Sequence, residues 1–342
     1  MLDSAVKSRA TSKPVLDAVI VICTHNRADL LGETLASIAA LSVSPSINWR
    51  VFVVANACTD ATPAVLDAWT QRLPLRWVHE NTPGLSHARN RAVRELASEP
   101  PELVLWTDDD VLVPTQWLEA YVEAARAFPA HDVFGGPIVP EFAGITPTWI
   151  ARGLPFFGEA FAEIDYGPFD TEVAPLGRLP FGANMAMRFA PLFSRKFDTR
   201  LGVTPTSRRC SEELVMLSSI LGPTRGWRYV IATSVRHQIS AARQTKSHLA
   251  ALYRGRGEIE ELLAPSAGNV VTIFGAPRWM LRAIAESYVA RLWFGWIRPD
   301  AVRYARMFAS THHRRGVITS FRIRHASQRH RLSSPAKDVQ LQ

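Results

Sequence analysis

The segment AVIVICTHNR (residues 18–27) divides into two parts of opposite character. Residues 18–23 form an apolar, β-branched run that is typical of a buried strand, and the polar run 24–27 ends it. Beyond this run, leucine and isoleucine side chains recur at three- and four-residue spacing as far as Ile38, which is the period of an amphipathic helix. The segment therefore predicts a strand, a polar loop and a helix in succession.

The same succession repeats along the next eighty residues or so. Strand-like runs recur at VFVVA (51–55), LRWVHE (75–80) and LVLWT (103–107), separated by helical patterns over residues 63–73 and 85–97. Strands that alternate with helices of this length indicate βαβ units and a parallel sheet flanked by helices. Ligands bind such sheets beyond the carboxyl ends of the strands, and each polar cluster of this region follows a strand.

The rest of the chain changes character twice. Residues 134–182 are rich in glycine, proline and aromatic residues with little period, which is typical of loops and short strands that cover a site. The remaining predicted elements are a helix at 212–221, a strand at 227–232 and helices from Lys246 onward, broken at residues 265–268 and at Pro299.

Composition places the chain among globular proteins. Its 342 residues are 47% hydrophobic and 20% charged, which suits one large domain or a core domain with an appendage. Cys23, Cys58 and Cys210 are far apart, so neither a disulfide framework nor a zinc site is expected, and a reducing cytosol is the natural compartment. Residues 1–16 lack the apolar stretch of a signal peptide and are predicted to form a polar lead-in.

Charge is unevenly distributed along the chain. The formal net charge of +8 combines −4 over residues 1–235 with +12 over residues 236–342, where 18 Lys and Arg face 6 Asp and Glu. This asymmetry predicts an acidic partner for the C-terminal part, whether anionic lipid, a phosphorylated substrate or nucleic acid.

Three consecutive carboxylates, Asp108, Asp109 and Asp110, follow the strand at 103–107 directly. Adjacent carboxylates repel one another, and a hard divalent cation bound to phosphate oxygens would neutralise them. Mg²⁺ or Mn²⁺ is typically held by one or two carboxylates together with substrate phosphates. The position after a buried strand favours this metal interpretation over the alternative, a solvated acidic turn or helix cap.

Other polar residues follow the first two predicted strands. Thr24, Asn26 and Arg27 follow the first, where backbone amides and a guanidinium can meet a phosphate or a base. Asp60 follows the second, where it either contacts a nucleoside or caps the next helix. For Asp60 in isolation, the cap is the favoured interpretation.

Later candidates carry weaker signals. Gly84 permits close approach of a ligand to the start of a helix whose first turn carries Arg89, although an ordinary turn has the same pattern. Glu212 and Glu213 start the next helix, where carboxylates suit the helix dipole without any catalytic role. His237 is a lone histidine, a type that is more often structural than a ligand.

The order of the motifs is more specific than any one of them. AVIVICTHNR, VVANACTD, ENTPGLSHARNRA and LWTDDDV are followed by LPFGANMAMR, RCSEELVMLSSILG and VRHQ. Over residues 17–240 this series resembles glycosyltransferase family 2. The resemblance implies a GT-A fold, which is an α/β fold with a Rossmann-like mixed sheet flanked by helices, followed here by a mainly helical C-terminal extension. It also implies inverting transfer from a nucleotide diphosphate sugar bound through Mn²⁺ or Mg²⁺.

The resemblance also implies residue roles by position. Donor or nucleoside contacts fall on Thr24, Asn26, Arg27, Asp60, Gly84, Arg89, Asp108 and Asp109, the donor-sugar and acceptor pocket on Gly182 and Asn184, metal contacts on Asp110, Asp108 and His237, and proton removal on Glu213 with Glu212 beside it. Such a reaction needs a base on one side of the anomeric carbon and a cation by the leaving diphosphate on the other.

The chain departs from the family pattern at two positions. Ala55 stands where family members often have an acid that helps to read the nucleobase, and UDP is the first expectation. Glu213 stands where the base is often Asp, and a glutamate carries out the same proton transfer with one more methylene group.

The C-terminal part mixes tryptophan with arginine. Trp279, Trp293, Phe294 and Trp296 lie among Arg278, Arg282, Arg291 and Arg298. A spanning helix is not expected, because no run of about 18 uncharged apolar residues occurs. A basic amphipathic helix with tryptophans is typical of an interfacial membrane segment, and a helical appendage with a solvated basic face is the alternative. Nucleic acid is not expected as a partner, because no recognised motif accompanies the charge.

The sequence thus predicts three parts: a lead-in (1–16), a transferase domain (17–240, with a nucleotide-binding half 17–112 and an acceptor half 113–240) and a basic helical region (241–342). The expected activity is that of a hexosyltransferase acting on a glycan, lipid-linked or small-molecule acceptor, in the cytoplasm or at the inner face of the membrane. One alternative is a nucleotidyltransferase, although residues 23–33 lack a glycine-rich phosphate loop with lysine. The other is a non-catalytic nucleotide-sugar-binding protein that acts through its basic region.

Overall fold

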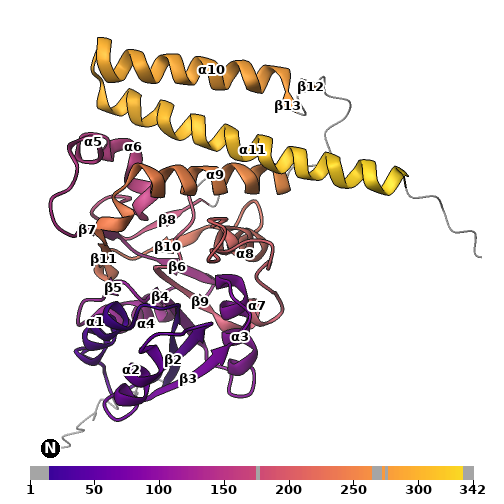
Figure 1. Cartoon of the computed structure of the whole chain (residues 1–342). Helices are drawn as coiled ribbons and strands as arrows, with labels where there is room; N and C mark the ends of the chain where they lie inside the picture. The colour runs from indigo at the N-terminus through magenta and orange to yellow at the C-terminus, as the bar shows by residue number, and fades with distance from the viewer. Residues whose placement is uncertain (1–14, 175–177, 264–271, 274–275, 334–342) are drawn as a thin grey trace, which may run out of the picture.

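The core of the protein is an eight-stranded mixed sheet (Figure 1). The computed structural model describes residues 15–174, 178–263, 272–273 and 276–333. In spatial order the strands are β3 (Leu75–Glu80), β2 (Ile47–Asn56), β1 (Leu16–Thr24), β4 (Leu103–Asp108), β9 (Asn184–Arg188), β6 (Val133–Gly135), β10 (Trp227–Tyr229) and β8 (Thr171–Val173). The first four are parallel, whereas β9 is antiparallel to both of its neighbours. The expected α/β class with a mixed sheet is confirmed.

Strand β1 lies in the middle of the parallel half because both of its faces are covered. Residues 18–22 are fully buried, and a strand buried on both sides needs a continuous apolar run rather than alternation. In the register of the sheet, Cys23 lies opposite Val54 of β2 and Asp108 of β4. The carboxyl ends of these three strands therefore meet at one edge, where the polar residues that follow them gather.

Helices cover the parallel half of the sheet. They are α1 (Ala28–Ala39), α2 (Thr62–Trp69), α3 (Leu85–Leu96) and α4 (Trp117–Ala127). Helix α1 buries Leu31, Leu35 and Ile38, as the spacing of its apolar residues predicted. Helix α2 ends earlier than expected because residues 70–73 turn into β3, and Pro74 disfavours helical conformation in the residue before it.

A second, three-stranded sheet brings a histidine to the same edge. It consists of β5 (Val111–Leu112), β11 (Val235–Ile239) and β7 (Ile138–Phe142), in the order β5-β11-β7. Strand β5 follows the aspartate triplet directly, and His237 of β11 lies opposite Val111. Antiparallel pairing thus places His237 beside the triplet, although more than a hundred residues separate them in the chain.

Residues 134–182 contain short elements, as the sequence predicted, and further short elements follow this stretch. They include α5 (Thr148–Ala151), α6 (Leu154–Phe157) and the 3₁₀ helix η1 (Gly158–Phe161), and later α7 (Phe189–Phe193), α8 (Glu212–Leu221) and the 3₁₀ helices η2 (Ile231–Thr233) and η3 (Ala241–Arg243). Of these elements, α6, η1, α8 and η3 contribute residues to a cavity at the carboxyl edge of the sheet.

The C-terminal region is helical, as expected. Its elements are α9 (Lys246–Leu263), the short strands β12 (Thr272–Ile273) and β13 (Ala276–Pro277), α10 (Arg278–Leu292), the π-helical turn η4 (Trp293–Ile297) and α11 (Ala301–Ser333). The predicted break at Pro299 precedes α11, and the one at residues 265–268 lies outside the described residues. Helices α9 and α11 cross closely, because a side chain at Gly257 or Gly316 would collide with the backbone of the facing helix.

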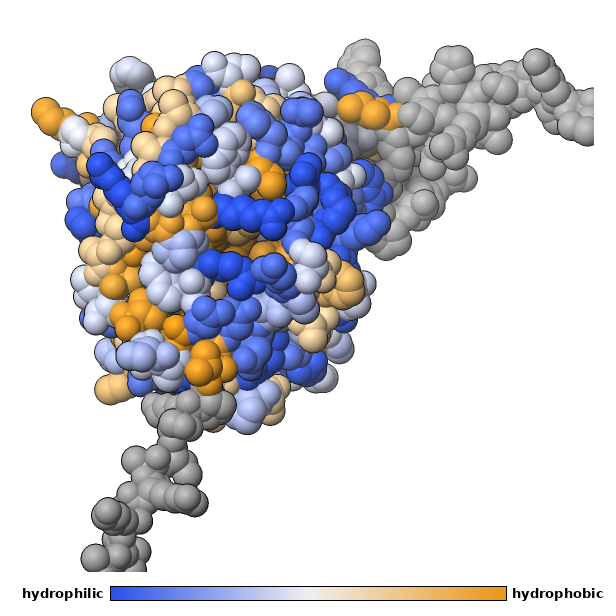
Figure 2. All heavy atoms as spheres, turned by 90° about the horizontal axis from the view of Figure 1, so that it is seen from below, coloured by the Kyte–Doolittle hydropathy of each residue, from blue (hydrophilic) through white to orange (hydrophobic). Residues whose placement is uncertain are grey.

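The C-terminal helices share an apolar cluster with α5, α6, η1 and β11. Phe157 of α6 and Ile239 of β11 pack there with Leu249 of α9 and Phe308 of α11. Figure 1 shows α10 lying along the outer side of α11, away from the main sheet. On the face seen from below, hydrophilic residues surround smaller apolar groups (Figure 2). Among the described helices, none combines the length and the apolar character that crossing a membrane requires.

Candidate active site

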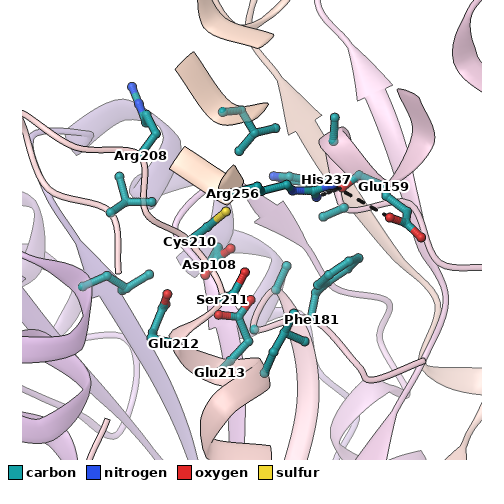
Figure 3. A pocket seen from close by; sticks show the side chains of 18 of the residues that line it. Asp108, Glu159, Phe181, Arg208, Cys210, Ser211, Glu212, Glu213, His237 and Arg256 are labelled. Carbon is teal, nitrogen blue, oxygen red and sulfur yellow. Dashed lines mark hydrogen bonds and ion pairs between the residues drawn. The ribbon is translucent and has the colours of Figure 1, made fainter. Parts of the chain in front are cut away.

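One cavity of about 1860 Å³ lies beyond the carboxyl ends of β1, β2 and β4, under α8 and α9. Pockets for small molecules commonly measure roughly 300–1,000 Å³, so this cavity has room for two ligands side by side. Figure 3 shows Asp108 near its centre, with Glu212 and Glu213 of α8 below and His237 to one side. The structure therefore brings the aspartate triplet, the glutamate pair and the histidine to one place.

Asp109 is occupied by contacts within the protein. The hydroxyl of Thr24 donates a hydrogen bond to Asp109 Oδ2 at 2.7 Å, and the guanidinium of Arg27 donates to Oδ1, also at 2.7 Å. Burial raises the pKa of Asp109 to about 6, although the Arg27 charge opposes this shift. Asp109 thus ties the loop after β1 to the triplet, and Thr24 and Arg27 are its partners.

Asp110 is surrounded by positive or hydrogen-bonding groups. Arg27 and Arg243 each donate to Asp110 Oδ2 at 2.9 Å, and His237 Nε2 lies 3.3 Å from Oδ1. Burial alone would raise the pKa of Asp110, but the contact with His237 and the guanidinium groups of Arg243 and Arg27 hold it well below its usual range. Asp110 is therefore ionised even though it is almost fully buried.

The other ring nitrogen of His237 fixes the orientation of its imidazole. His237 Nδ1 lies 2.9 Å from the backbone carbonyl of Phe161, so the Nδ1–H donates there. The lone pair of Nε2 then accepts a hydrogen bond from Arg243 at 3.0 Å, and Asp110 Oδ1 lies 3.3 Å from it. Histidines that bind metals typically donate their second N–H to a carbonyl or carboxylate in this way. Asp110 Oδ1, next to this lone pair, has no hydrogen-bond partner among the described residues.

Asp110 Oδ1, which has no hydrogen-bond partner in the described part of the chain, and His237 Nε2, which accepts from Arg243, are two neighbouring atoms of the kind that bind a divalent cation. No group of three or more His, Cys, Asp and Glu side chains in the described ranges is arranged to hold a metal by itself. Mg²⁺ and Mn²⁺ sites often need only one or two protein ligands, because phosphate oxygens complete the coordination. Asp108, whose pKa is raised by burial and by the Asp110 carboxylate, lines the cavity beside them.

The two glutamates differ sharply in environment. Glu212 is buried and accepts a hydrogen bond from Arg89 at 2.8 Å, whereas Glu213 Oε2 lies 3.5 Å from the same guanidinium, and its side chain is 13% exposed. Burial and the Glu213 carboxylate raise the pKa of Glu212 to about 8, against the opposing charge of Arg89. Figure 3 shows the Glu213 carboxyl group pointing towards the part of the cavity that holds Asp108.

Arg89 is held from all sides within the protein. Its guanidinium lies over the rings of Trp106 and Phe197, 5.7 and 5.5 Å from their centroids. Gly182 leaves room for it, because a Cβ at that position would collide with the guanidinium. Arg89 is nearly fully buried, so its nearest partners are the glutamates of α8 rather than an open donor site.

The backbone is strained where the cavity is lined. Ser211, which precedes the glutamate pair, has a φ of 92°, and Asn26 has a φ of 52°. Such values are uncommon for residues other than glycine, and they cluster at functional sites. Asn26 uses its side-chain oxygen to accept a hydrogen bond from the backbone N–H of Thr59 at 2.7 Å.

Two expected ligand contacts lie elsewhere. Asp60 is not among the residues that line the cavity, and its two carboxylate oxygens accept hydrogen bonds from the backbone N–H groups of Thr62 and Ala28. It bonds Thr62, the first residue of α2, and links the loops after β1 and β2, although the N-cap position itself is Ala61 and not Asp60 as the sequence favoured. A role for Asp60 at a nucleoside stays a prediction.

Asn184 differs more clearly from the expectation that it lines the pocket. Its side-chain oxygen accepts hydrogen bonds from Trp117 and Tyr121, both at 2.8 Å. Its amide nitrogen donates to the carbonyls of Pro137 and Thr233. The side chain is fully buried and satisfied, so it joins α4 to the loops above the sheet instead of meeting a ligand.

Gly84 lies where the sequence placed it, at the cavity wall. Its φ of 134° suits glycine, and its N–H donates to Asn56 Oδ1 at 2.8 Å. Asn56 is one of several lining residues that the sequence interpretation missed, and a polar residue at the end of an apolar strand was an available signal. Others are Arg208 in the segment before α8, Arg243 of η3, and His248, Tyr253 and Arg256 of α9.

Comparison with known proteins identifies the class. A family model described as glycosyl transferase family 2 matches residues 19–189, half of the chain. The chain therefore belongs to glycosyltransferase family 2, and it is a glycosyltransferase with the GT-A fold, as its series of motifs predicted.

Individual curated proteins match the chain over shorter stretches than the family model does. The succinoglycan biosynthesis protein ExoM of Rhizobium meliloti (strain 1021) is 30% identical over 136 residues, which cover 39% of this chain and 42% of ExoM. Validoxylamine A glucosyltransferase of Streptomyces hygroscopicus subsp. limoneus is 35% identical over 113 residues, or 32% of this chain and 24% of that protein. The chain thus matches less than half the length of either curated relative.

Solved structures share the fold over nearly the whole chain. S. aureus TarS (residues 1–349) in complex with UDP-GlcNAc has a TM-score of 0.51 at 15% identity and covers 92% of both chains. The mannosyltransferase PcManGT from Pyrobaculum calidifontis, in complex with GDP-Man and Mn²⁺, has a TM-score of 0.51 at 16% identity and covers 95% of this chain and 82% of its own.

Proposed function

We propose that this protein is an inverting hexosyltransferase that moves a sugar from a UDP-sugar to a hydroxyl of a glycan acceptor. One observation carries the proposal: the partly exposed carboxylate of Glu213 faces the same cavity as Asp108, Asp110 and His237. A base and a cation site on two sides of one cavity are the parts that inversion requires.

Asp110 Oδ1 and His237 Nε2 would hold Mn²⁺ or Mg²⁺, with Asp108 beside them. The bound cation would supply positive charge for the diphosphate that leaves. Arg27 and Arg243, which bond Asp110, offset part of the negative charge of the aspartate triplet on this side of the cavity. PcManGT, which shares the fold, was solved with GDP-Man and Mn²⁺, and TarS with UDP-GlcNAc.

Glu213 would remove the acceptor proton. As the acceptor oxygen attacks the anomeric carbon, its O–H bond breaks and the proton passes to the Glu213 carboxylate. The bond from the anomeric carbon to the diphosphate oxygen breaks on the opposite face, and its electron pair leaves with the nucleotide. Glu212 is buried and bonded to Arg89, so it holds the guanidinium in place beside Glu213.

A glycan acceptor fits the aromatic part of the cavity wall. Tyr166, Phe181, Phe156 and Tyr253 are among the lining residues, and aromatic faces are large apolar surfaces with which the C–H groups of a sugar ring can pack. ExoM is a succinoglycan biosynthesis protein, and polysaccharide biosynthesis is the setting we propose here.

The α10 helix would bring the enzyme to an anionic membrane surface. Large apolar side chains are exposed along α10 and η4: Trp279, Tyr288, Val289, Leu292, Trp293, Trp296 and Ile297. Trp296 is 84% exposed, and Arg278, Arg282 and Arg298 lie among these residues. Tryptophan beside arginine is the composition of segments that lie in the membrane interface.

Vesicle co-sedimentation tests the membrane contact. Replacing Trp293 and Trp296 by Ser should reduce binding to vesicles that contain phosphatidylserine, more so at high salt, where the arginines are screened. Ile145→Ser is the matched control, because Ile145 is 98% exposed but lies before α5. Equal sedimentation of all three proteins would refute the contact.

A donor panel tests the reaction itself. Thermal shifts with UDP- and GDP-sugars, with Mn²⁺ and with a chelator, should show metal-dependent stabilisation by one donor class, about 2.7 kcal/mol at a hundred times its dissociation constant. Slow release of nucleoside diphosphate from that donor would exclude a purely binding protein. Release of pyrophosphate from a nucleoside triphosphate in the presence of a sugar 1-phosphate would indicate a nucleotidyltransferase instead.

A further inference from the structure

Arg208 lies in the cavity wall without a counter-charge. It stands in the segment before α8, and Figure 3 shows its side chain reaching the cavity from the side opposite Glu159. Within the described part of the chain, no carboxylate forms an ion pair with its guanidinium. Its neighbour Arg209, in contrast, does not line the cavity and is paired with Glu258 of α9 at 2.9 Å.

Three more cationic or hydrogen-bonding side chains lie around Arg208. Arg27 comes from the loop after β1, Arg243 from η3 and His248 from α9, and all of them line the same cavity. Burial and the charges of Arg27 and Arg243 lower the pKa of Arg208. Burial and the three arginines lower the pKa of His248 to about 4, so at neutral pH it is an uncharged hydrogen-bonding group.

The charges of this cluster do not cancel. Arg27 and Arg243 are bonded to Asp109 and Asp110, whereas Arg208 adds a positive charge that no described carboxylate balances. Like charges held together in a partly buried site repel one another, and an anion placed among them relieves the repulsion. Arginine is also the side chain best suited to binding phosphate oxygens in pairs.

Helix α9 holds the Arg208 segment in place. A side chain at Gly255 would collide with the carbonyl oxygen of Arg208, so glycine lets α9 approach the backbone of the segment. The ion pair between Arg209 and Glu258 fixes the next residue to the same helix. The C-terminal region therefore positions a residue of the cavity wall.

We propose that Arg208, together with Arg27, Arg243 and His248, forms a cradle that binds the diphosphate of the donor and the nucleoside diphosphate product. The diphosphate is the favoured anion because Arg27 and Arg243 also contact Asp110, next to the proposed metal ligands. This inference rests on the proposed function. It makes α9 part of the donor site rather than only a support for the outer helices.

Calorimetry of the full chain in the presence of Mn²⁺ tests the cradle, with UDP, GDP, uridine and inorganic pyrophosphate as probes. Arg208→Ala should weaken binding of the preferred nucleoside diphosphate and of pyrophosphate about tenfold or more, the loss typical of a charged hydrogen bond. Arg208→Lys should recover part of this loss. Arg209→Ala is the matched control, and it should change both affinities less.

Uridine separates the cradle from the rest of the site. Its binding, where detectable, should be the same in Arg208→Ala and wild type, because it carries no phosphate. Glu258→Gln keeps its shape but loosens the Arg208 segment, so it should weaken pyrophosphate binding about threefold.

The outcomes separate this inference from the proposed function. Equal diphosphate and pyrophosphate affinities in Arg208→Ala and wild type would overturn the cradle alone. Arg208-dependent binding of pyrophosphate without binding of UDP or GDP would support the cradle and overturn the proposed donor. A wild-type protein that binds none of these probes would overturn both.

Discussion

The two acidic clusters of the cavity are neutralised in different ways. On the aspartate side, Arg27 and Arg243 are partly exposed to the cavity. Arg27 bonds both Asp109 and Asp110, and Arg243 and His237 contact Asp110. On the glutamate side, a single buried guanidinium, that of Arg89, serves Glu212 and Glu213. The first arrangement can exchange partners with a ligand, whereas the second is fixed in the protein interior.

This contrast fits the different roles that we propose for the two clusters, ligand binding for the aspartates and proton removal for the glutamates. A site that gains and loses phosphate and metal needs charges that can be reached from the cavity, and the aspartate side has them. A proton acceptor needs a stable position and a controlled local charge, and Arg89 provides both. The predictions that follow test each side in turn.

The largest effect is expected on the aspartate side. Asp110→Ala removes the carboxylate that lies beside His237, and no other oxygen stands in its place. Transfer should fall by at least about a thousandfold, since the cation contributes several kcal/mol and each 1.36 kcal/mol is a factor of ten. Nucleotide binding with and without a chelator should become equal. Unchanged turnover of wild type in the chelator would contradict the metal assignment.

The next effect separates the two glutamates. Glu213→Gln keeps the shape of the side chain but cannot accept a proton, so turnover should fall about 10²–10⁴-fold while donor affinity stays near that of wild type. Glu212→Gln should be milder in turnover, because Glu212 is buried against Arg89. Steady-state kinetics with the preferred donor measures both, and the reverse order of effects would identify Glu212 as the base.

Stability distinguishes the arginines of the two sides. Arg89→Met removes the buried guanidinium that bonds Glu212 and lies 3.5 Å from Glu213, so it should cost about 3–5 kcal/mol in the free energy of unfolding. Arg27→Met should cost clearly less, because its side chain is 36% exposed and Arg243 still contacts Asp110. Urea denaturation gives both values. The double variant Arg89→Met/Glu212→Leu should recover part of the loss, and no recovery would contradict the pairing.

The smallest expected effect is a dependence of stability on pH. The pKa of Glu212 is raised to about 8 in the folded protein, so its contribution is fully present below about pH 4.5 and is lost as pH rises through 8. The slope is at most about 1.4 kcal/mol per pH unit. Asp110 has a lowered pKa and behaves in the opposite sense, losing its contribution at acidic pH.

Urea denaturation between pH 5 and 9 measures the Glu212 contribution. Stability of wild type should decline with pH more steeply than that of Glu212→Gln, in which the side chain no longer titrates. Parallel curves for the two proteins would show that Glu212 is not buried as a protonated group.

The sequence predicted the scaffold better than the contacts. Residues 18–23 and 103–107 are continuous apolar runs, and both became strands buried in the main sheet. Local periodicity was sufficient there because a strand or helix is decided largely by its own residues. Asn184 shows the opposite case: its motif suggested a ligand contact, but four neighbours from three separate segments use its hydrogen-bonding groups.

The cavity residues missed by the sequence interpretation share one property. Arg208, Arg243 and His248 stand in segments that carry no recognisable signal by themselves, and only the packing of α8, η3 and α9 brings them to the triplet. Asp60 shows how local contacts compete with a role implied by resemblance, since its carboxylate bonds the first residue of α2 and does not line the cavity.

The sequence by itself determined which chemical groups stand at the ends of which elements: three aspartates after a strand, two glutamates at a helix start and an excess of arginine in the C-terminal part. Only the tertiary structure decided their environments. Arg89 reaches Glu212 across 123 positions of the chain, and Arg243 reaches Asp110 across 133. Propensity depends on near neighbours in the chain, whereas burial and ion pairing depend on segments that meet only after folding.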